Sequence, residues 1–214
     1  MRARGDTYSY EMDFKLNAKS VPALARLMLE LFIYGLGLAL MVEAQVGIAP
    51  WDVFAQGISI QTGITYGWAS VVVSIIVLIA WIPLKQRWGI GTVLNGLLIG
   101  LFADFWMEIL PQTSVYILQL AQFCLGLLVV ALATGLYISA KLGTGPRDGL
   151  MIGTQRLLGW KFWQVRTMFE GTVLTIGWLM GGQVREGTLI FALAIGYLMQ
   201  ASLKLFKFID PQAK

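Results

Sequence analysis

The sequence has no histidine and a single cysteine, Cys124, which lies within an apolar stretch. Histidine is the commonest general base and titrates near neutral pH, so its absence removes the usual acid–base catalyst and pH sensor. One cysteine forms no internal disulfide, and there is no Cys/His set that could bind zinc. We therefore expect no metal, no cofactor and no enzymatic activity; an enzyme that uses carboxylates alone is the remaining catalytic alternative.

Charged residues are also scarce, at 13% of 214 residues, where a soluble domain has about 25%. Hydrophobic residues make up 57%, and apolar runs of near membrane-spanning length recur along the chain. The composition predicts an all-α integral membrane protein whose surroundings are a lipid bilayer, with no nucleic-acid partner. Residues 1–20 are polar and lack the apolar core of a signal peptide, so we expect a cytosolic tail.

Six stretches are predicted to span the membrane: residues 22–45, 68–84, 90–110, 114–140, 163–181 and 188–206. The sixteen Lys and Arg residues alternate along the chain, with 5 before or at the start of the first span and then 0, 2, 0, 5, 1 and 3 in successive connections and the C-terminus. Short loops on the cytoplasmic side collect Lys and Arg. The alternation predicts that both termini are cytoplasmic.

An internal repeat divides the chain into residues 21–112 and 113–214. At a gapless offset of 96, five of the ten glycines from Gly35 to Gly100 meet another glycine, where about one is expected by chance. Each unit holds three spans, an odd number, so the two units are predicted to be inverted relative to one another. Inverted repeats with interrupted hydrophobic segments at matching positions are typical of secondary transporters.

Each unit also has a Gly-x-x-Pro-x-Asp turn, at 47–52 and 143–148. Proline suits the first position of a helix, and an aspartate in the first turn suits the helix dipole. About 12 residues follow each turn, or ~18 Å if helical, which is roughly half of a bilayer core. These segments either lie flat on the membrane surface or enter it from opposite sides as broken or re-entrant half-helices after spans one and four.

The doubled unit resembles the YczE/YyaS/YitT family of bacterial integral membrane proteins. The resemblance rests on Gly-x-x-Pro-Trp-Asp at 47–52, Thr-Gly-Ile-Thr-Tyr-Gly at 62–67 and Gly-Ile-Gly-Thr at 89–92, and it covers nearly the whole chain from the first span onward. It implies a protein of the bacterial cytoplasmic membrane and says little about the substrate.

Candidate substrate-binding residues lie at the two turns, with three further polar residues elsewhere. Arg147 occupies the position equivalent to Trp51, so the two half-sites differ chemically. An ionisable or polar residue within a span is a functional candidate, although a solvated outer rim is the alternative for the acidic ones. Glu170 is expected to pair with Arg166, four residues away. The candidates are Pro50, Trp51, Asp52, Pro146, Arg147, Asp148, Asn95, Asp104 and Glu43.

Small residues recur in spans three and six, where Gly96 and Gly100 match Ala192 and Gly196. Such spacing lets helices approach closely. We expect Gly96, Gly100 and Gly196 to mediate packing between the two halves, with a homodimer as the alternative.

Taken together, the sequence predicts a secondary transporter for a small polar or charged metabolite, with a cationic or zwitterionic substrate favoured because the outer carboxylates have few basic neighbours. A passive channel with the same pseudo-symmetric breaks and a non-transporting accessory or chaperone protein are the alternatives.

Overall fold

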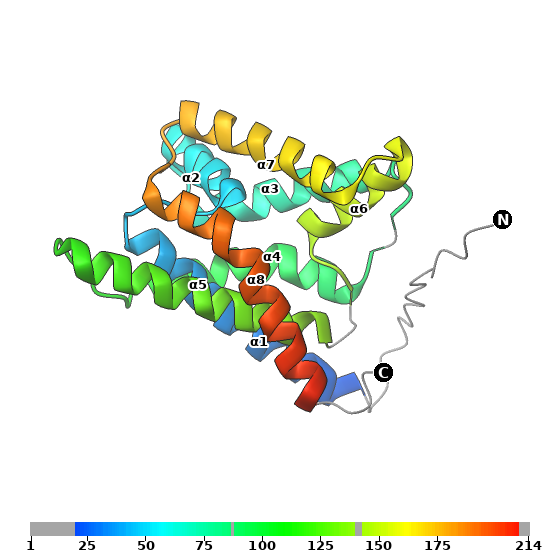
Figure 1. Cartoon of the computed structure of the whole chain (residues 1–214), viewed down its shortest axis with the longest axis horizontal. Helices are drawn as coiled ribbons and strands as arrows, with labels where there is room; N and C mark the ends of the chain where they lie inside the picture. The colour runs from blue at the N-terminus through cyan, green and yellow to red at the C-terminus, as the bar shows by residue number, and fades with distance from the viewer. Residues whose placement is uncertain (1–19, 87, 140–142, 210–214) are drawn as a thin grey trace.

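The computed structural model describes residues 20–86, 88–139 and 143–209, and these residues form helices and connecting loops with no strand (Figure 1). The predicted N-terminal tail lies almost entirely outside them. The helices are α1 (Ser20–Glu43), α2 (Pro50–Thr62), α3 (Tyr66–Trp81), α4 (Ile90–Met107), α5 (Tyr116–Ser139), α6 (Pro146–Leu158), α7 (Phe162–Leu179) and α8 (Glu186–Ile209).

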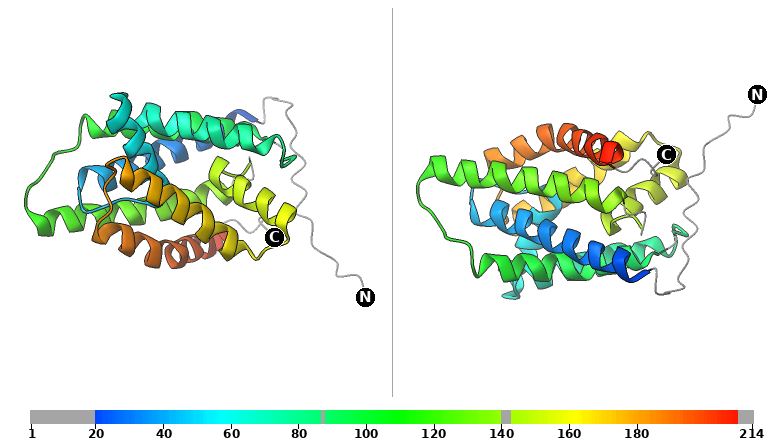
Figure 2. Two further views of the ribbon diagram at one scale, coloured as in Figure 1. Left: turned by 90° about the horizontal axis from the view of Figure 1, so that it is seen from above. Right: turned by 90° about the horizontal axis from the view of Figure 1, so that it is seen from below.

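The chain alternates between two ends of the molecule, which are left and right in Figure 1. Helix α1 runs from right to left, α2 lies in the left half, and α3 returns to the right. Helix α4 runs to the left and α5 to the right, and α6 lies in the right half. Helix α7 then runs to the left and α8 back to the right. Figure 2 shows the same placement of α2 and α6 near opposite ends. The start of α1 and the end of α8 therefore lie at the same end.

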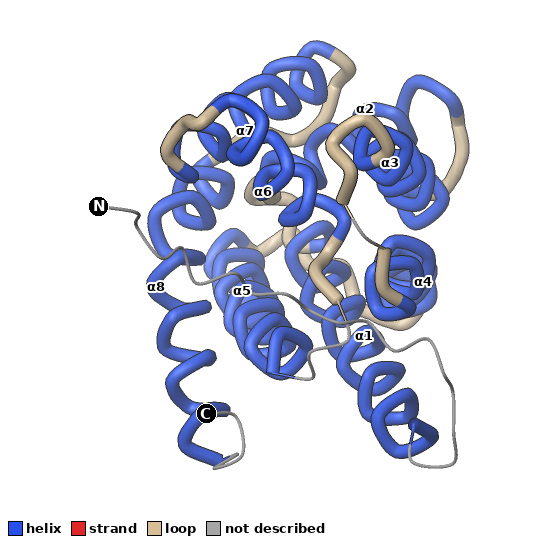
Figure 3. Tube along the Cα trace, turned by 90° about the vertical axis from the view of Figure 1, so that its right-hand side faces the viewer, coloured by secondary structure: helices blue, strands red, loops and turns tan. Residues whose placement is uncertain are grey.

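Helices α1 and α5 lie side by side and form the centre of one layer (Figure 3). Helix α4 packs on α1 and α8 packs on α5, while α2 packs against α7 and α3, and α6 packs against α3 and α7. The pairs α1–α4 and α5–α8 occupy equivalent positions in the two sequence units. The pairs α2–α7 and α6–α3 are equivalent in the same way.

Close contacts repeat at the residue level with the offset of 96 found in the sequence. A Cβ built on Gly57 would lie 2.8 Å from the Cβ of Met180. A Cβ built on Gly153 would lie 3.1 Å from the Cβ of Leu84. All four positions correspond between the halves, so glycine allows the same close helix approach at both α2–α7 and α6–α3.

Within the described ranges, four helices are long and apolar enough to cross a membrane: α1, α4, α5 and α8. They correspond to four of the six predicted spans. Helices α2 and α3, bent by 116° at their junction, would make a fifth as one broken span. Helix α7 has 18 residues but is not among the candidates, because it carries Arg166 and Glu170 within a less apolar sequence. The prediction of six spans is thus met in part.

The small residues predicted to pack between the halves behave differently from one another. A Cβ on Gly100 would lie 2.5 Å from the carbonyl oxygen of Gly67, so Gly100 joins α4 to α3 within the first half. Gly96 faces Ser74 of α3 and also the ring of Pro146 from the second half. Gly196 has no neighbouring atom within 4 Å among the described residues. Among the described helices, α3 packs along α4, whereas the equivalent α7 and α8 form no such interface.

Candidate functional site

Each of the two Gly-x-x-Pro-x-Asp turns contacts the other half of the molecule. Gly47 and Gly143 have φ of 105° and 131°, a region in which a side chain would be strained. A Cβ on Gly47 would lie 2.8 Å from Oγ1 of Thr188, and a Cβ on Gly143 would lie 2.7 Å from Oγ1 of Thr92. The Thr92 hydroxyl donates a hydrogen bond of 2.7 Å to the carbonyl oxygen of Thr144. Each turn is therefore held against the start of α8 or α4 in the opposite unit.

Pro50 and Pro146 are the first residues of α2 and α6, as the sequence predicts. Each helix ends at a left-handed glycine, Gly63 or Gly159. Neither helix start has a side-chain hydrogen-bond cap. Trp81 donates its indole N–H to the carbonyl oxygen of Pro146 at 2.9 Å, which fixes the start of α6 against α3.

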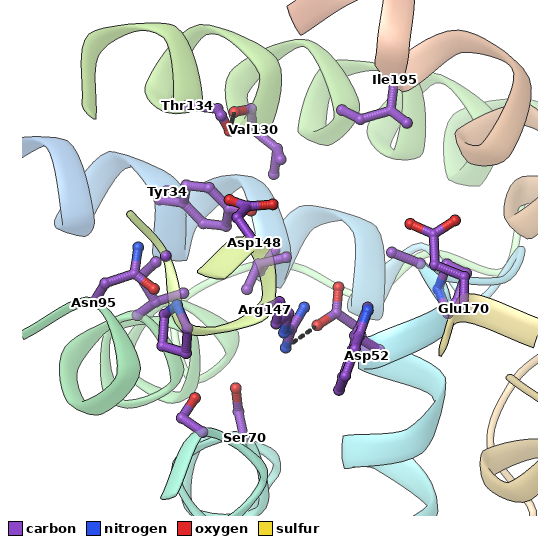
Figure 4. A pocket seen from close by; sticks show the side chains of 18 of the residues that line it. Tyr34, Asp52, Ser70, Asn95, Val130, Thr134, Arg147, Asp148, Glu170 and Ile195 are labelled. Carbon is purple, nitrogen blue, oxygen red and sulfur yellow. Dashed lines mark hydrogen bonds and ion pairs between the residues drawn. The ribbon is translucent and has the colours of Figure 1, made fainter. Parts of the chain in front are cut away.

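Asp52 and Arg147 form an ion pair that joins the two turns (Figure 4). Nη2 of Arg147 lies 3.0 Å from Oδ1 of Asp52, and the aspartate side chain is almost fully buried. The Arg147 guanidinium also lies over the Trp51 ring, 5.7 Å from its centroid. Trp51 and Arg147 occupy equivalent positions in the repeat. The difference between them provides the ring and the cation of the cation–π contact, and the same cation pairs with Asp52.

Asp148, the counterpart of Asp52, has a different environment. Its side chain is exposed to the cavity, and it forms no ion pair or hydrogen bond with any side chain in the described part of the chain. Figure 4 shows its carboxylate on the side of Tyr34 and Thr134, away from the Asp52–Arg147 pair. Arg166 and Arg147 are the cations that act on it electrostatically.

A cavity of about 140 Å³ lies between the two turns. Ten pairs of residues related by the offset of 96 account for 20 of its 23 lining residues. The two halves thus supply equivalent positions around one central space. The pairs are Tyr34/Val130, Leu38/Thr134, Ala49/Gly145, Pro50/Pro146, Trp51/Arg147, Asp52/Asp148, Ser70/Arg166, Ser74/Glu170, Asn95/Phe191 and Ile99/Ile195, and the others are Tyr137, Met151 and Met199.

Comparison with known proteins agrees with the resemblance seen in the sequence. Residues 22–204 match a family described as "Family of unknown function (DUF6198)". The chain belongs to the DUF6198 family. An uncharacterized protein of Haemophilus influenzae is 41% identical over 84% of this chain and 82% of its own length.

Two proteins of Bacillus subtilis extend the match. The uncharacterized membrane protein YczE is 36% identical over 81% of each chain, and the uncharacterized protein YyaS is 25% identical over 82% of this chain and 89% of its own. No solved structure matches the chain. The DUF6198 protein described here is accordingly a membrane protein related to YczE and YyaS.

Seven of the nine candidate substrate-binding residues line the cavity of this DUF6198 protein: Pro50, Trp51, Asp52, Asn95, Pro146, Arg147 and Asp148. Glu43 and Asp104 do not. Glu43 ends α1, and one of its carboxylate oxygens is buried without a hydrogen-bond partner in the described part of the chain. Asp104 accepts hydrogen bonds from the Thr65 hydroxyl and from the backbone N–H of Gly67 at 2.7 Å, so it ties the end of α4 to the start of α3.

Because Asp104 carries both of these bonds, we expect Asp104→Ala to destabilise the protein by about 1–3 kcal/mol. The change should lower Tm in detergent while the cavity keeps its ligand binding. Glu108→Ala, one turn further along the chain at an exposed residue, is the control and should leave Tm nearly unchanged. Loss of ligand binding with an unaltered Tm would instead place Asp104 in the binding site.

Several lining residues were not among the sequence candidates, although the repeat contains a signal for four of them. Ser70 and Ser74 on α3 are equivalent to Arg166 and Glu170 on α7, so both halves place polar residues four positions apart on a cavity-facing helix. The predicted Arg166–Glu170 pair is confirmed, with Nε 2.8 Å from Oε1. The remaining missed polar residues, Tyr34, Thr134 and Tyr137, carry no such pattern.

Proposed function

We propose that this DUF6198 protein is a secondary transporter that moves a small polar or charged metabolite across the bacterial cytoplasmic membrane. Substrate binds in the central cavity, and the two inverted halves expose it alternately to the two sides. The pairing of 20 of the 23 lining residues at one repeat offset is the observation that carries the proposal. A cavity at the interface of inverted repeats, beside the starts of interrupted helices, is where transporters bind their substrates.

In this proposal the chain crosses the membrane six times, and α2 and α6 approach the cavity from opposite sides. Helices α3 and α7 count as spans because each passes from one end of the molecule to the other (Figure 1). Ser70 and Ser74 of α3 and Arg166 and Glu170 of α7 line the cavity, and the two charged residues lower the hydropathy of α7. The start of α1 and the end of α8 lie at the end that carries most of the described basic loop residues, and by the positive-inside rule we take this end as cytoplasmic.

Within this proposal we assign the described conformation to an inward-open state. Asp104 fastens α3 to α4 at the outer end, and the equivalent residue in the second half is Gln200. Helices α7 and α8, which lack this connection, join at the outer end and diverge toward the cytoplasmic end (Figure 1). Closure of α7 on α8 with release of α3 from α4 would produce the outward-open state.

Transport by purified protein in proteoliposomes tests this function. The vesicles receive a mixture of small amines, amino acids and carboxylates under an imposed proton or sodium gradient, and the luminal contents are identified by mass spectrometry. We expect at least one compound to accumulate above its external concentration. Dissipation of a solute gradient without accumulation would favour a channel, and no movement of any compound would favour an accessory role.

A further inference from the structure

We infer that the cavity binds a small organic cation, and that Asp148 is the group that recognises its positive charge. The inference rests on the proposed transport function and names the substrate class of that same site. Among the described residues, the other charged side chains that line the cavity are paired with one another, whereas Asp148 is not.

Two of the three carboxylates that line the cavity in the described part of the chain are already paired with cations of the protein itself. Asp52 is paired with Arg147 at 3.0 Å, and Glu170 is paired with Arg166 at 2.8 Å. Arg147 is further held over the ring of Trp51. A substrate anion would have to compete with these carboxylates for each guanidinium.

Asp148 is the lining carboxylate that has no such partner among the described residues. Its two neighbours in charge, Arg166 and Arg147, each direct a guanidinium nitrogen to a different carboxylate. Among the described residues, the five charged ones that line the cavity carry one net negative charge, since three are acidic and two are basic. A monovalent cation beside Asp148 would make the cavity neutral.

The surroundings of Asp148 suit an ammonium group with an apolar body. Tyr34 and Thr134 line the same side of the cavity (Figure 4). Tyr137, which also lines it, is 4% exposed, and its hydroxyl has no hydrogen-bond partner among the residues that the structure describes. Aromatic rings attract cations, and a carboxylate forms its strongest hydrogen bonds with charged donors. The volume of about 140 Å³ restricts the ligand to a small molecule.

The asymmetry between the halves explains why one carboxylate remains available. Asp52 and Asp148 are equivalent, but the residues that precede them differ. Arg147 precedes Asp148 and forms an ion pair with Asp52. Trp51 precedes Asp52 and is uncharged, so it cannot form the equivalent ion pair with Asp148. One sequence difference therefore neutralises one aspartate and leaves the other facing the cavity.

Binding to the purified full-length protein tests the inference with probes of similar shape and different charge. Binding is measured by isothermal titration calorimetry and by the shift in Tm. The probes are cationic tert-butylammonium, neutral tert-butanol and anionic pivalate, together with the smaller cation methylammonium and the smaller anion acetate. We expect binding of at least one of the two cations and of neither anion. Asp148→Asn should weaken the binding about tenfold or more, whereas Glu108→Gln, outside the cavity, should leave it unchanged.

Preference for an anion, absence of cation binding, or cation binding that Asp148→Asn leaves intact would each overturn the inference. Its failure is distinguishable from failure of the transport proposal. Cation binding that depends on Asp148, without flux in proteoliposomes, would support the substrate class and refute transport. Accumulation of an anion would support transport and refute the substrate class.

Discussion

Replacing Arg147 with Met is expected to lower Tm by on the order of 10 °C, because Asp52 would lose its cation. The Asp52 side chain is 3% exposed, and removing one partner of a buried ion pair costs roughly 3–5 kcal/mol. An aspartate that only favoured its own helix start would be worth about 0.3–1 kcal/mol, so thermal unfolding in detergent distinguishes the two roles.

The double variant Arg147→Met/Asp52→Asn is the test of this explanation. It removes the charge that needs a partner, so its Tm should recover most of the loss. Arg166→Met is the matched control, because its partner Glu170 is 24% exposed and an accessible pair contributes about 1 kcal/mol or less. If the double variant is no more stable than Arg147→Met, the ion pair is not what Arg147 contributes.

Cross-linking α7 to α8 is expected to abolish transport, with a decrease of at least tenfold in initial uptake. Gly67 and Gly100 touch in the packed α3–α4 pair, and their equivalents on α7 and α8 are Trp163 and Gly196. Cysteines at 163 and 196, in a Cys124→Ala background, would come within disulfide distance only when α7 closes on α8. Oxidation should trap that state, and reductant should restore uptake.

Cysteines at 171 and 196 provide the control pair. Position 171 is equivalent to Ile75, which is 45% exposed although α3 packs on α4, so it should face away from α8 in both states. A channel of fixed structure would give no 163–196 cross-link. Uptake at an unchanged rate by protein in which the 163–196 disulfide has formed would rule out this movement as part of transport.

The repeat offset predicts which residues are equivalent, and the two turns that it relates, together with Asn95, led to 7 of the 23 residues that line the cavity. Seven of the nine proposed binding residues line one cavity, because both turns are interruptions that need partners in the opposite half. The offset does not predict which equivalent residues touch. The Asp52–Arg147 pair depends on the relative placement of α2 and α6, which no local pattern in the sequence contains.

The small-residue pattern in spans three and six did not predict which helices pack together, because packing also depends on the residues of the opposing helix. Gly100 packs on α3 because Gly67 and Ser70 leave room for it. At the equivalent places on α7 the chain has Trp163 and Arg166, and no described residue lies within 4 Å of a Cβ built on Gly196. Spacing within one helix cannot predict packing when the opposing surface differs.

Asp104 illustrates the same limit for charge. A carboxylate within an apolar span was a reasonable functional candidate, yet its hydrogen bonds go to Thr65 and to the backbone of Gly67. The sequence identified an unusual residue, and only the three-dimensional arrangement identified its partners.

The most direct test of the central claim, that two inverted halves surround one transport site, is the sidedness of equivalent positions. Thr62 and Leu158 are the last residues of α2 and α6, are related by the offset of 96, and are both exposed. Single cysteines at each, in a Cys124→Ala background, are treated with a membrane-impermeant maleimide in intact cells and in inside-out vesicles. The account predicts that the cysteine at 62 reacts only in intact cells and that at 158 only in inside-out vesicles; reaction of both from the same side would contradict it.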